Sequence, residues 1–410
     1  MVRLWTWFAS FVMPDGVLVL AAVGFLRPGG LPNWALPLEQ AFAYLVLVTG
    51  VLLGLYIRHT RILLALLLLA LADRALLNLS GVEAASAGID RIVFNAVALL
   101  LPLNLLSLAL ITERQILISR EMIRLILIIV QAFLVGWICL PDNAAVAAAL
   151  ESPFVDLRFT NWTPIAQAPL LAFGVALALQ AVRFTAYRNP VDRGFFWALV
   201  AVFLALHGTR TGWSPTNYLA TAGLLLIIDA YAEIYRSTYF DELTGIPGKV
   251  ALDQALFNLG QRYAIALIDI DHMKQINATH GYAAGDQVLR MVATKISAMP
   301  RDGAAFRDEG NKFVVVFPGK QAVDVLPHLE ELRKTVETSS VTLRAPRRLF
   351  RKAAAPVQVS ATISIGAAER DERRSTSEQV IKAAEVALAR AKSGGGNHVK
   401  ARVEGKVQAM

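Results

Sequence analysis

Residues 263–286 read YAIALIDIDHMKQINATHGYAAGD, an apolar run that ends in two aspartates and leads into a glycine-punctuated turn. The run Tyr263–Ile270 is typical of a buried β-strand. Alternation along a strand places Asp269 and Asp271 on one face, where two carboxylates at a strand end can hold a divalent cation against phosphates. The turn opens a helix at Asp286, which is either a helix cap or part of a ligand site.

Short apolar runs alternate with amphipathic segments through the whole C-terminal part of the chain, which indicates an α/β or α+β domain. Beyond the first strand, we expect a turn and helix at 280–299, a strand at 313–317, a helix at 322–338, a strand at 357–365 and a helix at 377–392.

Four motifs follow one another in this half: DELTG at 241–245, DIDHMKQINA at 269–278, SIG at 364–366 and AKSGGGN at 391–397. In this order they resemble motifs of the GGDEF family of diguanylate cyclases. The resemblance implies a nucleotide-cyclase-like palm domain of the GGDEF type. It also implies GTP as substrate, Mg²⁺ as cofactor, and a homodimer in which two facing domains make cyclic di-GMP.

The resemblance also implies roles for single residues. Asp269 and the Ile270 carbonyl would bind the metal that activates the attacking hydroxyl and neutralises charge at the phosphoryl group. The residues that it implies for nucleotide binding are Lys274, Asn277, Asp286, Gly310 and Lys392. For each of these residues, the alternative is a surface or capping role.

The family signature itself is altered, because the sequence EGNKF at 309–313 stands where the family has GGDEF. Asn311 replaces the second metal-binding carboxylate and is a poorer ligand for a hard cation. Lys312 adds positive charge near the metal position, a penalty of several kcal/mol even at an effective dielectric of about 20. We therefore expect a weakened Mg²⁺ site and lost catalysis, unless a register shift of the hairpin lets Asp308 or Glu309 supply the carboxylate.

The other half of the chain has the composition of a membrane protein. Of the full sequence, 55% is hydrophobic and 18% charged, far from a soluble average. A membrane span is a helix of roughly 17–25 mostly apolar residues. The segments that approach this are 5–25, 41–57, 62–79, 92–111, 125–140, 165–182, 194–208 and 217–235. The first is interrupted by Pro14-Asp15, which leaves seven or eight spans, and we expect it to stay as an anchor.

Arginines indicate the orientation, because cytoplasmic loops retain positive charge. With eight spans and a cytoplasmic N-terminus, the inner side holds Arg3, Arg58, Arg61, Arg114, Arg120, Arg124, Arg183, Arg188, Arg193 and Arg236. The outer side then holds only Arg27, Arg91, Arg158 and Arg210. This bias predicts a multi-pass protein of the bacterial inner membrane whose C-terminal domain is cytoplasmic.

Ionisable residues inside spans are candidates for function. Asp73 and Arg74 form the clearest pair, and His207, Asp229 and Glu233 lie in or near the last two spans. The alternative is that Asp73 and Arg74 neutralise each other or neighbouring helices, while the other three reach an interface.

Two loops and the single cysteine also bear on the function. The outer segment 141–164 is either a lid over a ligand site or a connector, and the basic segment 344–352 would bind membrane, an acidic partner or only solvent. With few aromatic residues among these charges, no nucleic acid partner is expected. Cys139 is the only cysteine, so a disulfide framework is excluded.

These observations predict a membrane sensor domain at 1–236, a short linker at 237–240, a degenerate GGDEF domain at 241–400 and a C-terminal tail at 401–410. We expect a non-catalytic module that binds GTP or a related nucleotide and acts through a protein partner. The alternatives are an active or weakly active diguanylate cyclase and a ligand-free dimerisation scaffold.

Overall fold

The computed structural model describes residues 11–27, 30, 32, 34, 36–57, 59–77, 89–110, 118–140, 162–299, 303–343, 357–371, 374–403 and 406–409. The segments 141–161 and 344–356, which include most of the predicted outer loop and the basic cluster, lie outside these residues. The chain divides into two compact units, Met1–Ile234 and Tyr235–Met410.

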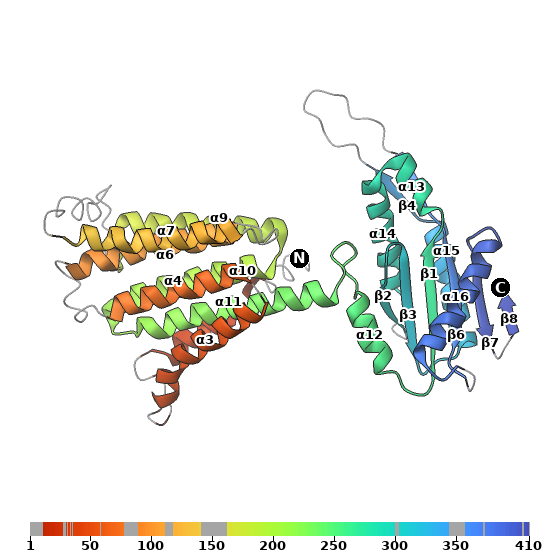
Figure 1. Ribbon diagram of the computed structural model, residues 1–410, viewed down its shortest axis with the longest axis horizontal. Coiled ribbons are helices and arrows are strands. Elements are labelled where there is room, and N and C mark those ends of the chain that lie inside the picture. Colours follow the sequence, from red (N-terminus) through yellow and green to blue (C-terminus); the bar gives the residue numbers. More distant parts are fainter. Residues whose placement is uncertain are drawn as a thin grey trace. The chain divides into compact units, whose positions relative to one another are not determined.

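The first unit is helical throughout the part that the structure describes (Figure 1). Its helices are α2 (Asp15–Phe25), α3 (Leu36–Ile57), α4 (Thr60–Leu77), α6 (Ile89–Leu110), α7 (Ile118–Ile138), α9 (Gln167–Tyr187), α10 (Pro190–His207), the 3₁₀ turn η4 (Gly208–Thr211) and α11 (Pro215–Tyr239). Each predicted apolar segment overlaps one of them.

Four of these helical segments are long and apolar enough to cross a membrane: Ile89–Leu110, Gln167–Tyr187, Pro190–Thr211 and Pro215–Tyr239. Shorter apolar helices lie at Asp15–Phe25, Ala41–Tyr56 and Met122–Ile138. Seven or eight spans therefore remain a prediction.

Helices α10 and α11 supply much of the interior of the first unit. The cap of α10 is local: the Asn189 side chain accepts from the Val191 N–H, and Pro190 occupies the first helical position. Phe195 on α10 and Tyr218 on α11 are fully buried. By contrast α7 exposes Phe133 and other large apolar side chains, as a helix does when its outer face meets lipid.

The second unit is a mixed sheet with helices against both faces (Figure 1). Its main strands are β1 (Tyr263–Ile270), β2 (Ala304–Arg307), β3 (Lys312–Pro318), β6 (Ile363–Glu369), β7 (Val399–Val403) and β8 (Lys406–Ala409), in the order β2-β3-β1-β6-β7-β8. Only the β6–β7 pair is parallel. Strands β4 (Ser340–Leu343) and β5 (Val357–Ser360) form a separate pair.

Strand β1 lies in the middle of the sheet and is buried on both faces. Ala264 and Ile268 pack in one core with α14 (Tyr282–Ser297) and α15 (Ala322–Glu337). The alternate residues Tyr263 and Ile265 pack in a second core with α12 (Lys249–Phe257) and α16 (Ser377–Ser393). The central position of β1 explains its continuous apolar run, and it places the end of the strand between helices.

Gly366 sets how closely α16 packs on the sheet. A Cβ at this position would lie 2.2 Å from the backbone nitrogen of Leu388, so only glycine permits this approach of α16 to β6. The close approach brings the last turn of α16, which carries Lys392, to the end of β1. This is the physical reason for the glycine in the SIG motif.

Two predictions about elements are corrected. The predicted strand at 357–365 is two strands, because β5 pairs with β4 while β6 pairs with β1 and β7. The sequence reasoning also missed the short helix α13 (Met273–His280), whose polar composition hides it from an apolar periodicity. The other strands and helices expected in this half lie within a few residues of their predicted positions.

Candidate functional site

A cavity of about 730 Å³ opens where β1 ends and β3 begins, beside α13, the start of α14 and the end of α16. The residues that line it are Asp269, Ile270, His272, Met273, Lys274, Gln275, Asn277, Tyr282, Asp286, Leu289, Arg307, Gly310, Asn311 and Lys392. The structure thus brings together the predicted metal and nucleotide residues from four separate segments. Lys312 is exposed at the start of β3 and does not line this cavity.

Asp269 is buried at the end of β1 with its carboxylate engaged on both oxygens. The side-chain amide of Asn311 donates to Oδ1 of Asp269, and the same nitrogen donates to the Ile270 carbonyl at 3.1 Å. The Lys392 ammonium lies 2.7 Å from Oδ2. The chain's own donors therefore occupy the lone pairs that a cation would need.

These residues do not fit a divalent cation. Mg²⁺ requires oxygen ligands in near-octahedral geometry, whereas the amide nitrogen of Asn311 is a donor that points at both predicted ligands. Turning the amide over would offer one neutral oxygen in place of the missing carboxylate. Among the described residues, no three histidine, cysteine, aspartate or glutamate side chains gather as a metal site.

Asp271 has a structural role, and the expectation of a carboxylate pair with Asp269 is wrong. Its carboxylate accepts from the hydroxyls of Thr362 at 2.9 Å and Ser364 at 2.7 Å, and from the backbone N–H of Asn397 at 2.8 Å. These bonds tie the end of β1 to β6 and to the loop after α16. Because these three hydrogen bonds use its carboxylate oxygens, Asp271 stabilises the segments around the site and does not line the cavity.

The hairpin between β2 and β3 is fastened to the opening motif of the domain. Arg307 lies 2.6 Å from Asp241 and donates to the Gly310 carbonyl at 2.9 Å. Burial opposes ionisation of Asp241, but hydrogen bonds from Thr244 and Arg307 lower its pKa below the usual value. Sequence reasoning missed Arg307, although its position next to the altered signature could have indicated it.

Lys249 holds the two acidic residues of the hairpin away from the site. Its ammonium lies 2.7 Å from Glu309 and 3.8 Å from Asp308. The hydrogen bond from Lys249, then the charges of Lys249 and Lys312, lower the pKa of Glu309. The expectation that Asp308 or Glu309 replaces the missing carboxylate is not met in this structure, because both face Lys249.

The cavity lining also carries the polar groups that the sequence predicted at a purine. The Oδ1 atom of Asn277 is buried without a hydrogen-bond partner. A Cβ on Gly285 would come within 2.0 Å of that oxygen, so glycine is required for Asn277 to sit there. Asp286 is half-buried beside it, and Lys274 and Tyr282 are exposed at the rim.

The ionisable candidates of the first unit form two groups of contacts. Asp73 and Arg74 form an ion pair, with 2.5 Å between Oδ2 of Asp73 and a guanidinium nitrogen of Arg74. This agrees with the alternative that the two residues neutralise each other. Asp229 does not reach an interface: it is fully buried and pairs with Arg193, which also lies 2.6 Å from Asp15. A polar network thus joins α2, α10 and α11.

Glu233 is also paired with neighbouring helices. It lies 3.6 Å from a guanidinium nitrogen of Arg61 and accepts a hydrogen bond from Asn189 at 3.2 Å. His207 stacks on Phe203 and lies against Trp162. Both groups therefore have neighbours on other helical segments, and their position at a water interface stays a prediction.

Comparison with known proteins gives a family match within the second unit and similar curated proteins. Residues 238–398 match the family model described as "Diguanylate cyclase, GGDEF domain". Diguanylate cyclase VdcA of Vibrio cholerae is 30% identical over 136 residues, which are 31% of this chain and 40% of that protein. Response regulator PleD of Caulobacter vibrioides is 31% identical over 167 residues, which are 39% of this chain and 35% of that protein.

A solved structure is also similar to this chain. The coiled coil and GGDEF domain of DgcB from Caulobacter crescentus, in complex with c-di-GMP, is 30% identical; the match covers 45% of this chain and 95% of that chain, with a TM-score of 0.38. The chain spans less than half the length of these two curated relatives.

Proposed function

Residues 238–398 form a GGDEF domain, and from that premise we propose a membrane signalling protein whose domain binds a nucleotide without making cyclic di-GMP. GGDEF domains act in cyclic di-GMP signalling, and relatives such as VdcA are named diguanylate cyclases. The proposal for this chain differs from theirs in the chemistry of its metal position.

The observation that carries the proposal is the contact of Asn311 with both predicted metal ligands. A cation between Asp269 and the Ile270 carbonyl would have to break two hydrogen bonds from the Asn311 amide and face the Lys392 ammonium. Without a second carboxylate, little is gained in return. Activation of the attacking hydroxyl, which the family's metals supply, would then fail.

Nucleotide binding is supported by other residues that line the same cavity. Asn277 has a buried oxygen without a partner, and Asp286 lies beside it, which is a donor and acceptor set suited to the edge of a guanine base. Lys274 and Lys392 supply positive charge for phosphates. We propose GTP or a related guanine nucleotide as ligand, with binding that depends little on Mg²⁺.

The output of such a domain would be a change in its contacts with another protein. Helix α11 runs without interruption from Pro215 to Tyr239, directly before the DELTG motif. We propose that the helical unit senses a signal, that the protein forms a homodimer, and that nucleotide occupancy changes its affinity for a protein partner.

The decisive experiment incubates the purified protein with GTP, ATP or cyclic di-GMP, with and without Mg²⁺, and measures both binding and product. We expect GTP to bind with a Kd that changes less than about threefold on adding Mg²⁺, and no cyclic di-GMP to form. An Asn311→Asp, Lys312→Glu double variant should make binding depend on Mg²⁺. Asn258→Asp, an exposed change of the same kind, is the matched control.

Three outcomes would contradict the proposal in different ways. Synthesis of cyclic di-GMP at rates on the order of 1 per second or more would identify an active cyclase. Absence of binding by every nucleotide would favour the ligand-free scaffold. A protein that is monomeric in detergent under all ligand conditions would exclude the homodimer while leaving nucleotide binding in place.

A further inference from the structure

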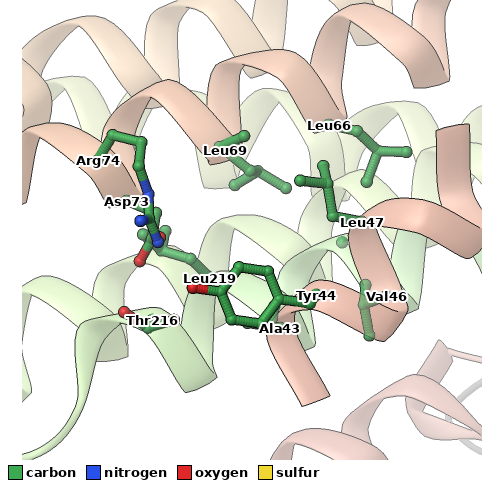
Figure 2. Close-up of a pocket in the computed structure, with 13 residues that line it drawn as sticks. Ala43, Tyr44, Val46, Leu47, Leu66, Leu69, Asp73, Arg74, Thr216 and Leu219 are labelled. Carbon is green, nitrogen blue, oxygen red and sulfur yellow. The ribbon is translucent and has the colours of Figure 1, made fainter. Parts of the chain in front are cut away.

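The first unit contains a cavity of about 280 Å³ between α3, α4 and α11 (Figure 2). Its two ends differ in chemistry. Asp73 and the hydroxyl groups of Tyr44 and Thr216 lie toward one end, while Leu47 and Leu66 line the other. The volume is at the lower limit of small-molecule pockets and about nine times the share of one water molecule in the liquid.

The polar end contains a carboxylate oxygen that lacks a partner. Asp73 is 8% exposed, and its Oδ2 atom pairs with Arg74. Its Oδ1 atom is buried and accepts no hydrogen bond from any described residue. A buried acceptor without a donor is unfavourable, so this oxygen requires a donor that no described residue supplies.

The charge at this end is already balanced. Arg74 neutralises Asp73, so a cationic ligand would leave a net positive charge among apolar side chains, and an anionic one would be repelled by Asp73. Water alone would satisfy the oxygen, but it would leave the leucine-lined end without suitable contacts. A neutral donor with an apolar body fits both ends.

We propose that this cavity binds a small neutral amphiphile, namely an aliphatic molecule with one hydroxyl head. The hydroxyl donates to Oδ1 of Asp73, and the aliphatic body packs against Leu47 and Leu66. Because three helices form the walls, and one of them is α11, occupancy couples the packing of α3 and α4 to that helix. The proposal concerns the helical unit and does not depend on the nucleotide chemistry of the GGDEF domain.

The test uses the full-length protein in lipid nanodiscs and a diazirine-bearing octanol as photoreactive probe. Mass spectrometry locates the adducts, and octanol, octane, octanoate and octylammonium compete with the probe. We expect adducts on α3, α4 and α11 at this cavity, and competition by octanol at a concentration about tenfold lower than by the other three. Equal competition by octane would overturn the proposal, because it would show that only apolar filling matters.

Two variants separate the polar and apolar halves of the argument. Asp73→Leu removes the acceptor, and we expect octanol to lose about tenfold in competition while octane is unchanged. Ala43→Leu fills the cavity and should abolish labelling, whereas Val48→Leu on the same helix, at a position 56% exposed, should not.

The wild-type competition series does not depend on whether either variant folds. Unchanged octanol competition in a folded Asp73→Leu protein would contradict the assigned hydrogen bond. Adducts confined to lipid-facing residues of the wild type would contradict the site. Because every readout is labelling, failure of this proposal is distinguishable from failure of the proposed nucleotide binding.

Discussion

Replacing Asn311 by aspartate tests the interpretation of the metal position most directly. The two side chains are nearly isosteric, so the exchange removes an N–H donor and adds a carboxylate without changing the packing. In the native protein this donor binds the carboxylate of Asp269 and the Ile270 carbonyl. In the variant two carboxylates and one carbonyl face one another, and a divalent cation becomes the group that can satisfy them.

The expected magnitude follows from two effects. A hydrogen bond to a charged group contributes about 1.5–3 kcal/mol, and two like charges about 4 Å apart repel by about 4 kcal/mol at an effective dielectric near 20. Lys392, which is 41% exposed and 2.7 Å from Asp269, offsets part of the repulsion. We expect a net loss of about 2–4 kcal/mol without divalent cations, or a fall in Tm of roughly 5–15 °C.

The assay is thermal unfolding of residues 235–410 in EDTA and at increasing Mg²⁺ concentration. Saturation at about 100 times the Kd should return about 2.7 kcal/mol to the Asn311→Asp variant. Mg²⁺ should leave the Tm of the wild type and of the exposed Asn258→Asp control unchanged. If the wild type gains as much from Mg²⁺ as the variant, or if the variant melts like the wild type in EDTA, the interpretation of Asn311 is refuted.

Arg193→Met should destabilise the helical unit by about 3–5 kcal/mol, because the buried carboxylates of Asp15 and Asp229 both lose their counter-ion. Unfolding in detergent measures this loss, and a value below about 1 kcal/mol would contradict the prediction. The pKa of Asp241 is lower in the folded protein than in the unfolded chain, where it is near 4, so the ionised carboxylate stabilises the fold at pH values above about 4. This stabilisation disappears as the pH falls through the pKa of the folded state. Asp241→Asn should therefore flatten the acid limb of a curve of unfolding free energy against pH. Gly366→Ala should cost about 1–3 kcal/mol and weaken nucleotide binding through Lys392, as paired melting and binding measurements would show; unchanged binding would mean that α16 does not position the site. Reporter fusions should give cytoplasmic signals after residues 187 and 239 and a periplasmic signal within 143–156, and a cytoplasmic signal from the last site would overturn the predicted orientation.

Local patterns were sufficient for most elements of this chain. Apolar segments of the first half are helices because a backbone in an apolar environment must satisfy its own hydrogen bonds. The strand Tyr263–Ile270 was predicted with its observed bounds, since a strand buried on both faces is apolar at every position. The helix α13 was missed because its polar composition carries no apolar periodicity, and the break between β5 and β6 was missed because the two strands pair with different, distant strands.

For the candidate site, too, some features followed from the sequence and others only from the structure. The ordered motifs were enough to identify Asp269, Asn277 and Lys392 as candidates, and the turn at 280–286 added Asp286, because each of these patterns is continuous in sequence. Which carboxylate faces the cavity depended on contacts across the sheet. Asp269 and Asp271 have the same strand parity, yet hydrogen bonds from Thr362, Ser364 and Asn397 engage only the second.

Sequence by itself therefore determined the apolar helices, the central strand and the altered signature, since each depends on neighbouring residues. Only the tertiary structure decided that the Asn311 amide binds the oxygens meant for a metal, and that Asp73 borders a cavity with one unsatisfied oxygen. Both depend on distance and direction between atoms that lie far apart along the chain. Hydrogen bonding and desolvation act at a few ångströms, so their balance exists only after the segments have packed.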